Sequence, residues 1–229
     1  MFWWRGEVEP GIHVAFTSTD AGNLALHVND DPDAVHQRRA TLATAAGIPA
    51  FQYMSQVHGN DVAMIERAGQ APTADAMISR GTPLAVMVAD CVPVVFFARD
   101  SNAAPIFAVA HAGRPGVVAN VIGKTVDELR AAGATAISAW MGPSVCGECY
   151  EVPTSMREDV SALEPAAWQE TSWGTPALDL PAAAAAQLER AGVEIKYRGE
   201  CTLENQGLYS HRRDQRSGRF AGLIWSTHE

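Results

Sequence analysis

Positive charge is scarce in this sequence. Lys and Arg total 17 of 229 residues against 26 Asp and Glu, which gives a formal net charge of −9. A surface of this sign repels the phosphates of a nucleic-acid backbone, so a nucleic-acid partner is not expected. A small anionic substrate stays compatible with it, because a local pocket can oppose the overall sign.

Long hydrophobic runs are missing as well. Residues 84–98 come closest, but Asp90 and Pro93 interrupt them, and no run is long enough to span a bilayer. Residues 1–6 show no basic region followed by an apolar stretch, so no signal peptide is expected. The sequence therefore predicts a cytoplasmic protein with no membrane partner.

Cysteine is rare, and two nucleotide-binding motifs are absent. Four cysteines are too few for a disulfide scaffold in a chain of this length. In a reducing compartment they are expected to be core residues, metal ligands or nucleophiles. No Gly-x-Gly-x-x-Gly opens a helix after a strand and no Walker A loop is present, so nucleotide binding by either route is unsupported.

The remaining pattern favours one large domain over residues 1–229. Hydrophobic residues make up 47% and charged residues 19%, as in ordinary globular proteins. Strand-like and helix-like segments alternate without the regular βαβ spacing of a Rossmann fold, which predicts a mixed α/β (α+β) fold. Strands are expected at residues 12–17, 51–57, 84–89 (continuing as 94–98 beyond a kink at Pro93), 106–110, 137–141, 193–197 and 220–225. Helices are expected at residues 32–45, 117–131, 153–163 and 181–192.

Three metal-competent side chains stand at or just beyond predicted strand ends. They are His58 in Gln-Val-His-Gly, Cys91 in Ala-Asp-Cys and His111 in Ala-His-Ala-Gly. Two imidazoles and one thiolate suit a tetrahedral zinc, and a fourth position left for water or substrate is the catalytic arrangement. The same residues also allow simpler interpretations: a core cysteine with hydrogen-bonded histidines, or a metal-free cysteine–histidine hydrolase pair.

Cys146-Gly147-Glu148-Cys149 has the spacing of a thioredoxin motif. It follows Gly142-Pro143, which indicates a loop, and it does not open a helix in a small βαβ unit, so a redox role is disfavoured. Both cysteines are expected to be dispensable for chemistry. Cys201 could join them as a metal ligand, but nothing in the sequence fixes a fourth partner.

The most basic stretch of this acidic chain is residues 210–219. Arginine presents a fixed fork of donors that suits phosphate, so this stretch is a candidate anion site. The alternative is a solvated turn in which Asp214 pairs with an arginine.

Several motifs in order resemble the YfiH-type family, also called laccase-domain proteins. The matching stretches are Asn-Leu-Ala-Leu-His-Val at 23–28 with Asp-Asp-Pro at 30–32, Gln-Val-His-Gly at 56–59, Ala-Asp-Cys-Val-Pro at 89–93, Ala-His-Ala-Gly at 110–113, Gly-Pro-Ser-Val at 142–145 with Tyr-Glu-Val at 150–152, and Ser-His-Arg-Arg-Asp at 210–214 with Gly-Arg at 218–219.

This resemblance implies a four-layer α/β/β/α sandwich of mixed sheets and a zinc site at His58, Cys91 and His111. It implies phosphorolysis of adenosine, inosine and methylthioadenosine, together with deamination of adenosine. The partners would be a purine nucleoside and phosphate. Two other activities attach to the family: copper-dependent polyphenol oxidation, with copper as the alternative metal, and removal of L-Ser from the peptidoglycan precursor UDP-MurNAc-L-Ser by an amidohydrolase with Cys91 as nucleophile. The non-enzyme alternative is a structural zinc protein, and a monomer is expected.

The resemblance also suggests roles for residues near the metal. Asp90 is expected to support the ligands or to accept a proton. Asn23 and Gln56 are substrate contacts by motif position alone. Arg114 and Arg212 are the expected phosphate contacts.

Two departures from the family pattern bear on phosphate. Thr19 stands where the family often has an arginine after the first strand. Pro115 stands where the family often has an arginine in His-Ala-Gly-Trp-Arg-Gly. With these two guanidinium groups absent or displaced, phosphate use is expected to be weaker than the resemblance alone implies.

Overall fold

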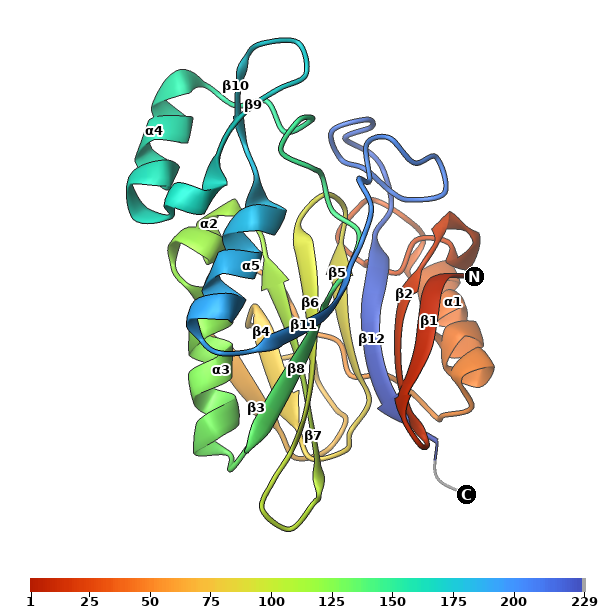
Figure 1. The fold of residues 1–229 in the computed structure, drawn as a ribbon. Coiled ribbons are helices and arrows are strands. Elements are labelled where there is room, and N and C mark those ends of the chain that lie inside the picture. Colours follow the sequence, from red (N-terminus) through yellow and green to blue (C-terminus); the bar gives the residue numbers. More distant parts are fainter. Residues whose placement is uncertain (228–229) are drawn as a thin grey trace.

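Two β-sheets face each other in the middle of the molecule (Figure 1). The computed structural model describes residues 1–227. The smaller sheet is antiparallel throughout, with strand order β1-β2-β12-β5. Its strands are β1 (Phe2–Glu9), β2 (Ile12–Thr17), β5 (Leu84–Val88) and β12 (Phe220–Ser226).

The larger sheet has six strands in the order β11-β8-β6-β7-β4-β3. It is mixed, because β3 pairs with β4 and β11 pairs with β8 in parallel, whereas the other pairs are antiparallel. Its strands are β3 (Val62–Ile65), β4 (Ala76–Ser79), β6 (Val92–Arg99), β7 (Pro105–Ala112), β8 (Ala136–Met141) and β11 (Glu194–Arg198). A hairpin of β9 (Trp168–Glu170) and β10 (Pro176–Leu178) projects beyond this sheet (Figure 1).

Helices cover the outer faces of both sheets, which gives the expected four-layer α/β/β/α sandwich. The four-stranded sheet is covered by α1 (Pro32–Ala46). The six-stranded sheet is covered by α2 (Arg114–Val118), α3 (Val121–Ala131) and α5 (Leu180–Arg190), whereas α4 (Thr154–Leu163) packs against the β9–β10 hairpin (Figure 1). Short 3-10 turns lie at Thr19–Ala21 and Pro165–Ala167. No helix among residues 1–227 is both long enough and apolar enough to cross a lipid bilayer.

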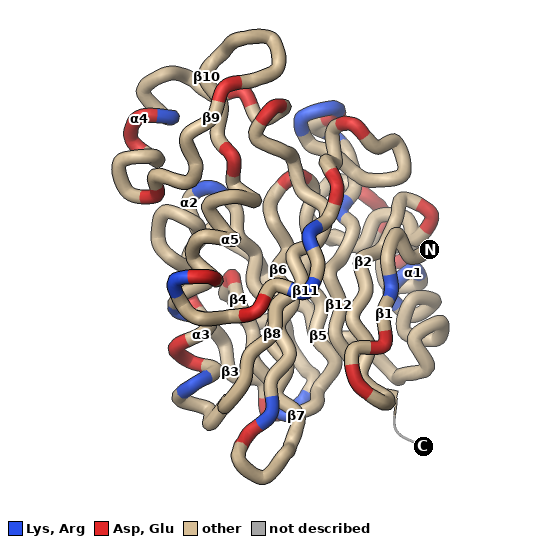
Figure 2. The backbone as a smooth tube through the Cα atoms, in the orientation of Figure 1, with Lys and Arg blue, Asp and Glu red and all other residues tan. Residues whose placement is uncertain are grey.

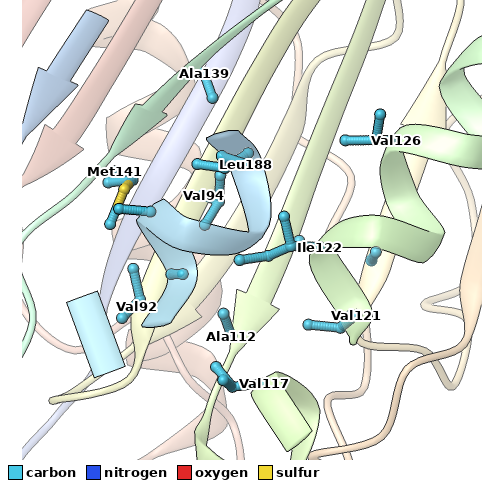
Figure 3. Close-up of a cluster of buried hydrophobic side chains, with 14 of the residues drawn as sticks. Val92, Val94, Ala112, Val117, Val121, Ile122, Val126, Ala139, Met141 and Leu188 are labelled. Atoms are coloured by element: carbon cyan, nitrogen blue, oxygen red, sulfur yellow. The ribbon is translucent and has the colours of Figure 1, made fainter. Parts of the chain in front are cut away.

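The central strands are buried on both faces, which explains their continuous apolar sequence. In β6, Val94 packs toward the helices and its neighbour Val95 packs between the two sheets, as the alternation of side chains along a strand requires. Figure 3 shows the helix-facing layer, where Val94 of β6 lies near Ile122 of α3 and Leu188 of α5.

Helix boundaries follow local signals in the sequence. Asp31 caps the start of α1, because its side chain accepts a hydrogen bond from the Asp33 N–H in the first turn of that helix. Gly47 ends the helix with φ 74°. Asp179 caps α5 in the same manner. These starts and stops confirm the boundaries expected from capping residues.

Residues 84–98 are the main correction to the expected strands. They form two strands in different sheets, β5 and β6, instead of one strand kinked at Pro93. The reversal is at Asp90, whose φ of 80° turns the chain from one sheet to the other. Hydrophobicity could not reveal this, because both strands are buried on both faces and their sequences look continuous.

Residues 51–57 do not form the expected strand. Their backbone makes only isolated bridges, from Gln52 to Leu84 and from Ser55 to Thr73. The Gln56 side chain pairs with β5 as a neighbouring strand would. Its amide donates to the Met87 carbonyl at 2.7 Å and accepts from the Met87 N–H at 2.9 Å. The apolar residues Phe51, Tyr53 and Met54 are buried in the core clusters and do not belong to a ladder.

The expected helix over 117–131 is also divided. Asn120 adopts φ 56°, and its side chain accepts a hydrogen bond from the Gly123 amide to start α3. An asparagine is among the few residues that tolerate this conformation and also cap a helix. Strands β1, β3, β4, β9 and β10 were not anticipated, since their short or half-buried sequences lack a clear period.

The core between the sheets predicts a large cost for Phe107→Ala. Phe107 on β7 is fully buried between the sheets, and removal of a buried ring typically costs about 3–5 kcal/mol. We expect a clear loss in the free energy of unfolding, measured by urea denaturation. Met64→Ala is the matched control, because Met64 on neighbouring β3 is 52% exposed and should change stability by less than about 0.5 kcal/mol. Equal effects in the two variants would contradict this packing.

Candidate functional site

The structure brings His58, Cys91 and His111 together from three parts of the chain. His58 lies in the loop before β3, Cys91 in the turn between β5 and β6, and His111 near the end of β7. One ligand atom from each lies within 4.8 Å of the others. The Cys91 Sγ is 3.9 Å from the His58 Nε2, and the two imidazole rings meet edge to face at 4.6 Å between centroids.

The spacing of the three ligands is close to that around a bound metal. Zinc lies about 2.3 Å from sulfur and about 2.0 Å from imidazole nitrogen, so a tetrahedral site separates the two donors by about 3.6 Å. The observed sulfur–nitrogen distance of 3.9 Å is close to that value. The three residues are therefore suited to hold one metal ion and to leave a coordination position open.

The buried carboxylate of Asp75 binds the imidazole of His111 and the backbone of His58. Its Oδ1 lies 2.8 Å from the His111 Nδ1 and accepts the His58 backbone N–H at 2.9 Å. Its Oδ2 accepts the N–H groups of Val57 at 3.2 Å and Gly59 at 2.6 Å. These bonds hold His58 at φ 60°, a conformation that few residues other than glycine adopt. With Nδ1 of His111 engaged, its Nε2 is directed to the metal position.

Sequence reasoning missed Asp75. The residue directly precedes β4, and no motif marks it as different from any other acid before a strand. Burial would raise the pKa of this carboxyl, but the hydrogen bond from His111 and those from the backbone lower it below its usual value. Asp75 is therefore ionised, as a partner of a metal-ligating histidine should be.

The negative charge of Cys91 and the positive charge of His111 each favour the charged form of the other. Burial would raise the pKa of the Cys91 thiol, but His111 and then His58 lower it to about 6. Burial would lower the pKa of His111, but the Cys91 thiolate and Asp75 raise it to about 9. Without a metal, the sulfur is thus a thiolate at neutral pH, which is the form that binds metals.

Gly113 lies directly against the three ligands. A Cβ at this position would come within 2.8 Å of the His58 Cδ2, 3.1 Å of the Cys91 Sγ and 3.5 Å of the His111 Nε2. Its φ is −74°, which any residue can adopt. The glycine is therefore required for space at the metal position and not for backbone conformation.

A cleft of about 290 Å³ opens beside the ligands. The guanidinium of Arg114 has no hydrogen-bond partner among residues 1–227. Arg212 lies 4.4 Å from the centre of the Tyr150 ring and donates to the Glu151 carbonyl at 2.8 Å. The cleft is lined by His58, Ala89, Asp90, Cys91, Arg114, Pro115, Val145, Tyr150, Leu180, His211 and Arg212. Tyr150, Val145 and His211 were not singled out from the sequence as site residues, although all belong to motifs that mark the family.

Asp90 links the metal ligands to the wall of this cleft. Its Oδ1 accepts the Thr202 hydroxyl at 2.6 Å and its Oδ2 accepts the Arg212 backbone N–H at 2.7 Å. Its carbonyl accepts the Val145 N–H at 3.0 Å. Because both carboxylate oxygens already accept hydrogen bonds, this geometry suits a positioning role better than that of a proton acceptor.

Asn23 and Gln56 do not line the cleft. The Asn23 amide bonds to the backbone of Ala25 and Arg219 and to the carboxylate of Asp30. The Gln56 amide bonds to the backbone of Met87. Both side chains therefore hold loops in place, and nothing in this arrangement supports them as substrate contacts.

A family model described as multi-copper polyphenol oxidoreductase laccase matches residues 12–227. The chain belongs to this family. The resemblance to YfiH-type proteins drawn from the motifs is thereby confirmed, and solved structures agree with it. A Neisseria meningitidis member described as DUF152 superposes with a TM-score of 0.83 at 29% identity, covering 99% of both chains. YlmD of Geobacillus stearothermophilus gives 0.81 at 29% identity, covering 95% of this chain and 93% of that one.

Relatives that are closer in sequence carry the name of an activity. A purine nucleoside phosphorylase of Streptomyces coelicolor is 44% identical, over 94% of this chain and 96% of the relative. A purine nucleoside phosphorylase of Mycobacterium tuberculosis is 42% identical, over 90% of this chain and 85% of the relative.

The two departures from the family pattern leave no cation at their positions. Thr19 lies in a 3-10 turn, where its amide donates to the Gly207 carbonyl at 2.8 Å. Pro115 lines the cleft beside Arg114.

In the loop before β12, Figure 2 shows several basic positions. Arg213 in this loop donates to the carbonyls of Thr202 and other loop residues and so holds the loop itself.

Arg219 is a further cation near the centre. Burial lowers the pKa of its guanidinium, while Cys91 and Asp90 oppose that shift, and the guanidinium donates to the carbonyls of Ser217 and Gly218 at 2.7 and 3.1 Å. It lines a second cleft of about 380 Å³ with His27, Val28, Asn29, Gln215 and Arg216. The sequence motif contained Arg219, but its charge had not been assigned to the site.

Cys146 and Cys149 do not line the cleft that contains the ligands. Burial raises the pKa of Cys146 to about 11 and also raises that of Cys149. A redox-active Cys-x-x-Cys motif instead lowers the pKa of its nucleophile. The geometry therefore agrees with the view that these thiols take no direct part in the chemistry.

The role of Asp75 predicts that Asp75→Asn weakens zinc binding. Loss of the charged hydrogen bond to a metal-ligating histidine typically costs about 10–100-fold in metal affinity. Competition with a chromophoric chelator measures this change. Asp61→Asn is the control, because the Asp61 side chain is 79% exposed and pairs with Lys124 at the surface. An unchanged dissociation constant in Asp75→Asn would remove Asp75 from the support of the site.

The lowered pKa of Cys91 predicts a pH profile for the chelator-treated protein. A thiol with a pKa of about 6 is thiolate above that pH and protonated below it, so alkylation of Cys91 by iodoacetamide should be half-maximal near pH 6. Cys146, with a pKa of about 11, serves as the internal control and should react slowly at neutral pH. Mass spectrometry of the two peptides gives both rates. A midpoint for Cys91 near that of a free thiol would contradict the thiolate–imidazolium pair.

Proposed function

We propose that this protein is a zinc-dependent purine nucleoside phosphorylase that acts on adenosine, inosine and methylthioadenosine and also deaminates adenosine. The observation that carries the proposal is an open three-ligand centre beside a cleft with an unpaired guanidinium. The names of the relatives in the same family supply the substrate class. A cytoplasmic location and a monomeric state stay predictions.

The metal would be held by His58, Cys91 and His111, with Asp75 behind the histidines. Zinc in such a site supplies a Lewis acid with one coordination position open to substrate or water. Gly113 keeps the space in front of the ligands clear. Zinc is favoured over other metals because the donor set mixes imidazole nitrogen with thiolate sulfur.

Phosphorolysis requires residues that bind phosphate and a donor for the leaving purine. A phosphate oxygen bonds to C1′ of the ribose while the bond from C1′ to the purine nitrogen breaks, and the purine leaves with the electron pair. Arg114 and Arg212 are the cleft cations that would bind the phosphate dianion and stabilise charge in the transition state. His211 at the same cleft can donate an N–H to a ring nitrogen of the leaving purine. Asp90 would position Arg212 through its backbone N–H.

A second candidate is an amidohydrolase that edits peptidoglycan precursors with Cys91 as nucleophile. The observation that favours it is the thiolate character of Cys91 beside two histidines. Polyphenol oxidation by several coppers fits less well. Two groups of potential ligands converge among residues 1–227, and only one of them contains imidazole.

The test is product analysis with purified protein of known metal content. Adenosine and inosine should give free base and ribose 1-phosphate only when phosphate is present, and adenosine should give inosine without phosphate. Cys91→Ser should lose the zinc of this centre and both activities. Activity that persists in the metal-free protein would favour the cysteine hydrolase, and copper as the dominant metal would favour the oxidase.

The charge of the cleft predicts that Arg114→Ala or Arg212→Ala raises the phosphate concentration needed for half-maximal rate. A lost charge-assisted hydrogen bond costs about 1.5–3 kcal/mol, which corresponds to roughly one to two decades in affinity. Deamination of adenosine is the internal control, and Arg67→Ala, at an exposed arginine beyond β3, is the matched variant. If both cleft variants keep the wild-type phosphate requirement, the anion site lies elsewhere, and Arg219 becomes the next candidate.

A further inference from the structure

Three of the four cysteines converge at a second place, away from the proposed catalytic centre. Ligand atoms of Cys146, Cys149, Cys201 and Glu204 lie within 4.8 Å of one another. The sequence offered the three thiols without a fourth partner, and the fold supplies the Glu204 carboxylate. We propose that these four residues bind a structural zinc ion, separate from the ion held by the catalytic centre.

The distance between the Cys149 and Glu204 ligand atoms agrees with tetrahedral zinc. The Cys149 Sγ is 3.6 Å from the Glu204 Oε1. Bonds of about 2.3 Å to sulfur and about 2.1 Å to oxygen would separate these donors by about 3.6 Å in a tetrahedron. Four protein ligands close the coordination sphere, which is the mark of structural zinc sites, and three thiolates favour zinc over harder cations.

The backbone around the cysteines is arranged as two facing loops. The N–H groups of Cys149 and Tyr150 both donate to the Cys146 carbonyl, at 3.1 and 3.0 Å, which folds the Cys-x-x-Cys segment into a turn. The other loop is joined to it by a parallel bridge between Ser144 and Cys201. The Cys146 N–H points at the Cys201 Sγ at 3.4 Å, as a donor to a metal-bound thiolate would.

Three thiolates and a carboxylate carry more negative charge than one zinc ion neutralises. The structure places a cation next to this loop. Arg213 donates to the carbonyls of Thr202, Leu203 and Asn205 at 2.9, 3.1 and 3.2 Å, in the segment that directly follows Cys201. The Cys146 N–H at the Cys201 Sγ offsets part of the excess charge, and Arg213 holds the loop that follows Cys201.

Ordinary core packing does not explain this group. The local apolar cluster is small, with Val145, Cys149 and Cys201 as its buried members. Cys146 is only half-buried and Glu204 is exposed, yet the Glu204 carboxylate is directed at a thiol. A disulfide would use two of the sulfurs and would leave the third thiol and the carboxylate without a role.

A zinc ion here would link the two loops that form one side of the cleft. Val145 and Tyr150, on either side of the Cys-x-x-Cys turn, both line the cleft. The loop of Cys201 is joined through Thr202 to Asp90, and Asp90 in turn holds the backbone of Arg212. None of the four ligands lines the cleft, so the ion would stabilise the site without taking part in the reaction.

The test is the zinc content of protein expressed with added zinc and purified without chelators. The wild type should hold two zinc ions per chain, and Cys91→Ser and Cys149→Ser one each. Glu148→Gln, an exposed acid inside the same turn, is the matched control and should hold two. Cobalt substitution adds a spectroscopic measurement, because absorption from thiolate-to-cobalt charge transfer grows with the number of thiolate ligands. Cys91→Ser should keep most of this absorption, and Cys149→Ser should lose most of it.

This experiment can disprove the structural zinc site without disproving the catalytic centre on which the proposed function rests. A wild type with one zinc that disappears in Cys91→Ser would overturn the structural site and leave the catalytic centre intact. Two zinc ions retained in Cys149→Ser would also overturn it. If Cys149→Ser does not fold, Glu204→Ala serves in its place, since the exposed side chain can be removed without a cavity. That variant should release the second zinc to a chelator faster than the wild type, and an unchanged release rate would contradict the proposal.

Discussion

A single buried carboxylate, that of Asp75, holds the candidate centre together. It accepts three consecutive backbone N–H groups from the loop of His58 and binds the imidazole of His111. Because Asp75 is fully buried, an unpaired charge there would be very costly, so these partners are held firmly. The same carboxylate fixes the direction of the His111 imidazole and the backbone of His58, and it raises the basicity of His111 toward a metal.

The second constraint is the turn by which the chain passes from one sheet to the other. Asp90, with φ 80°, lies in the turn after β5 of the four-stranded sheet, and Cys91 directly precedes β6 of the six-stranded sheet. The turn thereby carries a thiol to the edge where β7 presents His111. The carboxylate of Asp90 then holds the loop that carries Arg212. A conformation that is unfavourable for an aspartate is thus used where two sheets, a ligand and a cleft meet.

The sign of the charge at the cleft differs from the net charge of this acidic protein. Its net charge of −9 repels anions in general, yet Arg114 and Arg212 line the cleft beside Cys91 and His58. Arg213, in the same basic stretch, donates to loop carbonyls and so stabilises structure. Position in the fold therefore decides which guanidinium groups are available to a phosphate and which hold the backbone.

The sequence alone determined the features that depend on local chemistry. Caps at Asp31 and Asp179 set helix starts, buried strands such as β7 were visible as apolar runs, and the motif residues His58, Cys91 and His111 identified the donor set and the family. A cap or an apolar run acts over a few residues, so it can be recognised without knowledge of the fold. Features that join distant segments could not be recognised in this way.

Only the tertiary structure decided that residues 84–98 divide between two sheets and that Asp75 supports both histidines. It alone placed Glu204 with three cysteines and turned the amides of Asn23 and Gln56 toward backbone. In each case, the partner is far away in the chain and is chosen by packing and by the need to satisfy buried polar groups. Those needs exist only once the chain has folded, which is why residue identity and spacing could not reveal them.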